Sequence, residues 1–270
     1  YRFAVKLGKA TLTEAAEEGT KLGRTSFRCL LSNTPIPLDY IRSQAQAGLM
    51  GARLMAVVTD GRRSRVYLSP TEEMESVAAT ALPQWKPDVE FFKQALGFRI
   101  GNYGLSTWAD LFTPRQLVAL NTFCDLVTEA RDLAKTLALA NKMSDDGVGL
   151  EAGGHGATAY ADAIACYMSI ATSRWADFSN TICSWNQVNQ NIRVLFSRQA
   201  IPIAWDYAEL SPFSSVGPWL AAVESISDSL PSIPAPGKSS VAQLDAACLC
   251  PHSKACFSTD PPYYDNIGYA

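Results

Sequence analysis

Four residues near the end of the sequence, Asp260, Pro261, Pro262 and Tyr263, form a pattern suited to chemistry on an amine. The Asp260 carboxylate and the Pro261 carbonyl can both accept a hydrogen bond from one exocyclic NH2 group, which leaves the nitrogen lone pair free to act as a nucleophile. The two prolines restrict the backbone, so these acceptors are oriented before a substrate binds. Tyr263 offers an aromatic face on which a base turned out of a duplex can stack. The pattern predicts a binding site for the amine of a nucleobase.

A secondary-structure element must hold such a site in place. Residues 256–259, directly before the motif, are predicted to form a short buried strand. Ligands of open α/β folds bind at the carboxyl ends of strands. A four-residue pattern can also arise by chance. The alternative is therefore a strand followed by a proline-stiffened turn, in which Tyr263 and Tyr264 are ordinary packing residues.

A β-hairpin is predicted in the first third of the chain. Residues 53–58 and 64–68 are β-prone, and they flank Asp60 and Gly61, a pair that tolerates the positive φ of a tight turn.

Helices are predicted from cap residues and apolar periodicity. Residues 69–72 predict a helix with Ser69 as its N-cap, which Pro83 would end. Residues 113–116 predict the start of a long amphipathic helix, and residues 157–185 a second one that packs against it. Shorter helices are predicted at residues 39–46 and 219–230.

The composition is that of an ordinary globular protein, with 270 residues, 47% of them hydrophobic and 18% charged. The sequence contains neither an apolar run of about eighteen residues nor the layout of a signal peptide. We therefore expect a cytoplasmic protein without a membrane partner. The odd number of cysteines, seven, favours reduced thiols over a disulfide framework.

The net charge of −3 argues against a protein that coats nucleic acid, so any contact with DNA must be local. Arginines gather in two places, where phosphate binding and an ordinary solvated surface are the alternatives. The two groups are Arg53, Arg62, Arg63 and Arg65, and Arg193 and Arg198.

The run T-D-P-P-Y-Y-D-N-I-G-Y-A at residues 259–270 resembles the fourth conserved motif of a family of large prokaryotic adenine-specific DNA methylases. Members of this family are often described as containing a zinc ribbon, and some belong to phage-defence systems. Four further segments resemble the central region of the same family, so the resemblance covers nearly the whole chain. These segments are residues 51–58, 65–72, 109–117 and 198–209.

The resemblance implies a site-specific DNA-methyltransferase of the restriction-modification kind, which transfers a methyl group from S-adenosylmethionine to the exocyclic amine of adenine. DNA is then a partner, and other defence-system proteins are further partners. The implied catalytic residues are Asp260, Pro261, Pro262 and Tyr263. The implied substrate-binding residues are Thr259, Tyr264, Asp265 and Asn266.

The implied fold is α/β, a fragment of a class I (Rossmann-like) methyltransferase that carries a large, mainly helical insertion. The chain would then be an internal fragment that ends at the Asp-Pro-Pro-Tyr motif. Its expected parts are a mixed α/β region at 1–102 with a hairpin near 53–68, a mainly helical insertion at 103–230, a linker at 231–245 and a partial catalytic core at 246–270.

In this family the glycine-rich motif that binds S-adenosylmethionine lies upstream of the segment that the chain resembles. Residues 146–156 are the nearest imitation, but they follow a predicted helix end and not an apolar strand. We expect them to form a flexible loop, and we expect the fragment alone to be inactive.

Three cysteines and a histidine, Cys248, Cys250, His252 and Cys256, offer the atoms that zinc prefers. Their spacing lacks the two residues that usually separate paired cysteines, so no metal is predicted. Cys29 stands alone where the zinc ribbon of the family would have paired cysteines, which indicates that any ribbon has lost its metal.

Three other residues could contact cofactor or DNA: Arg115, Asp206 and Glu209. The alternatives are a helix cap for the arginine and buried, turn-capping carboxylates for the acids. The alternative for the whole chain is a non-catalytic, helical module of the same family that binds DNA or protein.

Overall fold

In the residues that it describes, the computed structural model combines helices with three small antiparallel sheets, so the protein is broadly α/β. The residues it describes are 2–8, 20–23, 26–91, 99–194, 201–214, 218–233, 245 and 258–259.

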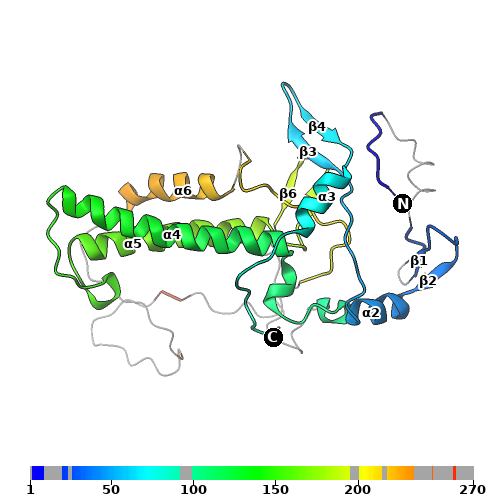
Figure 1. Ribbon diagram of the computed structural model, residues 1–270, viewed down its shortest axis with the longest axis horizontal. Coiled ribbons are helices and arrows are strands. Elements are labelled where there is room, and N and C mark those ends of the chain that lie inside the picture. Colours follow the sequence, from blue (N-terminus) through cyan, green and yellow to red (C-terminus); the bar gives the residue numbers. More distant parts are fainter. Residues whose placement is uncertain are drawn as a thin grey trace.

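Three helices form an elongated bundle, and the β-strands lie beyond one end of it (Figure 1). They are α4 (Pro114–Ala140), α5 (Ala157–Phe178) and α6 (Pro218–Ser229), and α5 packs against both of the others. Aromatic rings join the three helices. Phe123 of α4 lies 5.3 Å, between ring centroids, from both Trp175 of α5 and Trp219 of α6.

The start of α4 follows from its sequence. Thr113 Oγ1 accepts a hydrogen bond from the backbone N–H of Gln116, and Gln116 Oε1 accepts one from the backbone N–H of Thr113. Pro114 in the first turn fits because its missing N–H would have had no partner there. The predicted capping box is confirmed, and it fixes where the helix begins.

The second long helix ends at Phe178, so the predicted helix to residue 185 is wrong beyond that point. Asn180 is fully buried, and its Oδ1 accepts hydrogen bonds from the backbone N–H groups of Ile182 (3.0 Å) and Cys183 (3.1 Å). Its Nδ2 donates to two carbonyls of the last turn of α5. This amide supplies the partners that a further helical turn would have supplied, and the chain continues as strand β5 (Ser184–Asn186).

The strands pair as three hairpins of two antiparallel strands each. They are β1 (Ser26–Arg28) with β2 (Pro35–Pro37), β3 (Val57–Asp60) with β4 (Arg65–Leu68), and β5 with β6 (Asn191–Arg193). The remaining elements are α2 (Leu38–Gln46), α3 (Glu72–Ala79) and the short 3-10 helices η1 (Ile100–Tyr103), η2 (Trp108–Leu111), η3 (Leu150–Ala152) and η5 (Leu230–Ser232). The described ranges contain no parallel strand pair.

Helix α3 is capped by Thr71, not by Ser69 as predicted. Thr71 Oγ1 accepts a hydrogen bond from the backbone N–H of Met74 at 3.2 Å. Ser69 Oγ accepts instead from the backbone N–H of Val5 at 3.0 Å, so it ties the N-terminal segment to the end of the β3–β4 hairpin.

The apolar core outside the bundle joins segments that are far apart in the sequence. Its buried members are Phe91, Ile100, Leu111, Ile182 and Ile201. Two of them lie in residues 83–102, a connecting stretch without regular periodicity. These two residues belong to the core because of how they pack, and no helix or strand periodicity in the sequence predicts it.

The predicted strand at residues 256–259 is only partly within the described chain. Ser258 and Thr259 are exposed and lie in no strand, which corrects the prediction for these two residues. Of the helices in the described ranges, none is at once long and apolar enough to cross a bilayer.

Candidate nucleic-acid interface

The β3–β4 hairpin ends in a tight turn that presents arginines. Asp60 and Arg65 are the last paired residues, and the Gly61 N–H donates to the Ser64 carbonyl at 3.0 Å. A Cβ at position 61 would lie 2.5 Å from that oxygen and 2.7 Å from Val66 Cγ2. Glycine is therefore required by space, and not by the positive φ that the sequence suggested.

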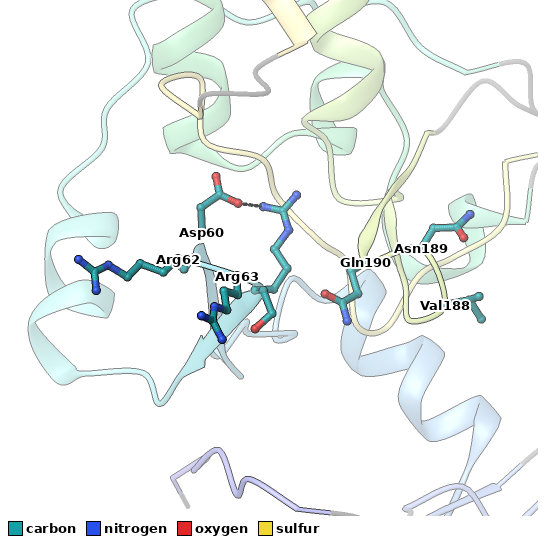
Figure 2. A pocket seen from close by; sticks show the side chains of 9 residues that line it. Asp60, Arg62, Arg63, Val188, Asn189 and Gln190 are labelled. Carbon is teal, nitrogen blue, oxygen red and sulfur yellow. Dashed lines mark hydrogen bonds and ion pairs between the residues drawn. The ribbon is translucent and has the colours of Figure 1, made fainter.

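One arginine of this turn is used within the protein. Arg65 Nη1 lies 2.5 Å from Asp60 Oδ1, and this ion pair closes the base of the turn. Arg62 and Arg63, at the tip, are exposed and make neither a hydrogen bond nor an ion pair with the described residues. Figure 2 shows their side chains extending away from the Asp60–Arg65 pair. Two cationic groups are thus left for an external anion.

The β5–β6 hairpin has a turn that is ordered by one amide. Asn186 Oδ1 accepts hydrogen bonds from the backbone N–H groups of Val188 (3.1 Å) and Asn189 (3.4 Å). It also accepts one from Arg193 Nη2 at 3.5 Å. Gln190 takes a left-handed backbone conformation with a φ of 49°. The turn holds exposed amide side chains at its tip.

The two hairpin turns lie next to each other. Tyr67 of β4 and Trp185 of β5 meet edge to face, with ring centroids 6.4 Å apart. An open hollow of about 480 Å³ is lined by residues 60–65 of one turn and 188–190 of the other (Figure 2). It carries three arginines and one aspartate, so its charge suits a phosphate group.

Most residues of the predicted amine-binding site lie outside the described chain. Thr259 is described and is exposed. Those outside are Asp260, Pro261, Pro262, Tyr263, Tyr264, Asp265 and Asn266, and also Cys248, Cys250, His252 and Cys256. The described residues bring together no group of three side chains that could hold a metal ion.

Arg115 and Glu209 are brought together, as partners of one another. Arg115 Nε donates to Glu209 Oε1 at 2.8 Å, and its Nη2 donates to the Tyr207 hydroxyl at 3.2 Å. Burial alone would lower the pKa of Arg115, but these partners outweigh burial and raise it. The guanidinium therefore holds the segment at 207–209 to the start of α4. Asp206 and Glu209 are both exposed, so the alternative of buried, turn-capping carboxylates is wrong for both.

Trp205 joins further segments through its ring. Its centroid lies 5.6 Å from that of Phe27 in β1 and 5.2 Å from that of Tyr103 in η1, both edge to face. Trp205 is still 46% exposed. These contacts connect the β1–β2 hairpin to the main body.

The glycine-rich loop after α4 is held by two aspartates. Asp145 Oδ1 accepts hydrogen bonds from the backbone N–H of Thr158, at 3.0 Å, and of Gly147, at 3.2 Å. Asp146 accepts a hydrogen bond at Oδ1 from the backbone N–H of Val148, at 3.0 Å, and one at Oδ2 from that of His155, at 2.8 Å. These bonds lower the pKa of both carboxyls. The loop was predicted to be flexible; the structure instead shows a hydrogen-bonded turn that caps α5.

The glycines of this loop have a packing role. A Cβ at position 154 would lie 2.0 Å from the Val148 carbonyl oxygen, and one at position 156 would lie 2.0 Å from that of Ser144. The loop follows a helix and approaches its own backbone, so it does not form the strand–loop–helix cradle that a methyl donor needs.

The sequence did not indicate that the β5–β6 turn belongs to this candidate interface, because the β3–β4 turn that it lies next to is far away along the chain. The only local signal is the amide-rich run N-Q-V-N-Q-N at residues 186–191. Such a run is typical of turns and does not identify a partner.

In a comparison with known proteins, no family model, curated protein or solved structure matches the chain.

Proposed function

We propose that this chain is part of a DNA methyltransferase that transfers a methyl group from S-adenosylmethionine to the exocyclic amine of adenine in DNA. The observation that carries the proposal is the run at residues 259–270, whose residue types suit the binding of an amine and which resembles a methylase motif. The four further resembling segments support it. The exposed Arg62 and Arg63 of the β3–β4 turn support a contact with DNA.

In this proposal each motif residue has a role set by its chemistry. Asp260 and the Pro261 carbonyl hold the two amine hydrogens, Pro262 limits backbone motion and Tyr263 stacks on the base. Thr259 and Tyr264 to Asn266 line the same site. S-adenosylmethionine, when bound, supplies an electrophilic methyl group. The described residues do not offer its glycine-rich cradle, so we assign its binding to none of them.

The finer fold is also part of the proposal. The bundle of α4, α5 and α6 would be a helical insertion in a Rossmann-like methyltransferase core, with residues 246–270 belonging to that core. Phage defence would be the biological setting, with other defence proteins as partners.

The test uses the complete protein and radiolabelled S-adenosylmethionine with adenine-containing duplex DNA. We expect Asp260→Ala to lower the rate of methyl transfer by roughly 10²–10³-fold, because a preorganised acceptor for the amine is lost. Cofactor affinity, measured by calorimetry, should stay within about twofold, since the carboxylate faces the amine.

The matched control is Asp228→Ala, which removes an exposed carboxylate of α6 and should leave the rate unchanged. Equal methylation by Asp260→Ala and wild type would refute the assignment.

The alternative is a non-catalytic module that binds DNA. The exposed arginines at the hairpin turn favour it, because phosphate contacts need no reaction. A complete protein that binds duplex DNA but transfers no label to it would support this alternative over the enzyme.

A further inference from the structure

We propose that the tips of the β3–β4 and β5–β6 hairpins form one contact for the phosphate backbone of duplex DNA. Arg62 and Arg63 neutralise phosphates, and the Gln190 amide donates a hydrogen bond beside them. This inference rests on the proposed function only in taking DNA as the substrate. It adds the surface by which DNA is held.

The first support is that two positively charged side chains of the turn have no partner among the described residues. Arg65 in the same turn is paired with Asp60, whereas Arg62 and Arg63 have no described partner. The chain as a whole is acidic, with a net charge of −3, so an approaching polyanion finds favourable potential only at local sites such as this one. Arginine suits phosphate because its planar fork matches two phosphate oxygens.

The second support is the rigid base on which these arginines stand. The Asp60–Arg65 pair and the close approach at Gly61 fix the turn, and the Tyr67–Trp185 contact fixes it against the second hairpin. A fixed backbone lowers the ordering cost of binding, so that only side-chain rotamers must be restricted.

The third support is the polar neighbour. Gln190 points toward the arginine turn and Asn189 points away from it, into the surroundings (Figure 2). Both are exposed. Amide N–H groups beside arginines are common donors to phosphate and sugar oxygens, and such contacts set orientation on the duplex without reading its sequence. The contact should therefore be independent of the base sequence.

The test measures the affinity of the complete protein for duplex DNA at several salt concentrations. Each phosphate contact steepens the fall of log K with log salt by about 0.9. We expect Arg62→Ala and Arg63→Ala each to lower the slope by about 0.9, and the double variant by about 1.8. At 0.1 M salt this corresponds to about an eightfold loss of affinity for each arginine.

The matched control is Lys142→Asn, two residues after the end of α4. That end of α4 lies at the opposite end of the bundle from the β3–β4 hairpin (Figure 1). Lys142 is exposed with a φ of 63°, a conformation that asparagine tolerates. It removes one positive charge and should leave the slope unchanged. Arg62→Lys with Arg63→Lys should keep most of the slope, because charge is retained. Circular dichroism checks that each variant is folded.

The outcomes separate this inference from the proposed function. An unchanged slope in the double variant, equal losses in Lys142→Asn, or tighter arginine-dependent binding of duplex RNA would each overturn the DNA contact. Methyl transfer is measured independently through Asp260. Arginine-dependent DNA binding without methyl transfer would leave the contact standing and sink the methyltransferase.

Discussion

A single buried amide, Asn180, decides where the second long helix, α5, stops. Its side chain is fully buried and makes four hydrogen bonds to backbone groups, two as acceptor and two as donor. A buried polar group is tolerated only when its partners are all in place. Asn180 meets that condition and turns the chain from α5 into β5.

Replacing Asn180 by alanine should therefore destabilise the protein. The buried Ile182 N–H would lose its acceptor, whereas the Cys183 N–H would keep its 3.4 Å bond to the backbone carbonyl of residue 180, and we expect the free energy of unfolding to fall by about 2 kcal/mol. Urea unfolding measures the change. Asn102→Ala, at an exposed position, is the control and should shift the value by no more than about 0.5 kcal/mol. A similar shift in both variants would contradict the role of Asn180.

At the scale of elements, the start of α5 depends on ionised carboxylates. Asp145 accepts hydrogen bonds from the backbone N–H and the hydroxyl of Thr158, in the first turn of the helix. A negative charge at a helix N-terminus is favourable as well. Asp146 and Asp162 fix the preceding loop through the N–H groups of His155 and Leu150. The loop and the helix are thus ordered together.

This arrangement predicts a dependence of stability on pH. The hydrogen bonds lower the pKa of Asp145, Asp146 and Asp162 in the folded protein below the unfolded value of about 3.9. Groups of this kind stabilise the fold fully above the unfolded pKa, and the contribution is lost as the pH falls through the folded pKa. Stability should begin to decline below about pH 5.

Urea unfolding across pH 3 to 7 tests this expectation. Asp145→Asn should weaken the decline, because one titrating group is removed while one acceptor oxygen is kept. Asp228→Asn removes an exposed carboxylate near the end of α6 and is the control. A decline that is unchanged in Asp145→Asn would show that the cap does not contribute to it.

The sequence predicted elements whose cause is local. The capping box of Thr113 and Gln116 involves neighbours along the chain, and α4 begins there as expected. The end of α5 was missed because nothing in a helical pattern reveals that Asn180 will be buried with four partners. The Tyr67–Trp185 contact could not be foreseen either, since it depends on how two distant hairpins pack.

At the scale of the whole molecule, the core of Phe91, Ile100, Leu111, Ile182 and Ile201 joins parts on both sides of the α4–α5 pair. Two further contacts also join segments that are far apart in the sequence. Arg115 holds Glu209, and the Trp205 ring holds Phe27 and Tyr103. The chain thus returns after α5 to the region from which α4 began.

Ile201→Ala should therefore weaken the molecule as a whole. Ile201 is 2% exposed, and truncation of such a residue costs about 2–4 kcal/mol through lost transfer energy and a residual cavity. The loss is read from urea unfolding followed by tryptophan fluorescence. Ile233→Ala, at a 53% exposed position, is the control. Equal stabilities of the two variants would argue that the cluster is not a core.

The same core sets an order of events when the chain is made. Helices α4 and α5 are consecutive and pack on each other, so they can associate as soon as α5 leaves the ribosome. Phe91, Ile100 and Leu111 are synthesised earlier but must wait for Ile182 and Ile201 before water is excluded from them. During that interval their apolar surface is open to chaperones, and it is covered only after Ile201, which follows the β5–β6 hairpin, has been synthesised.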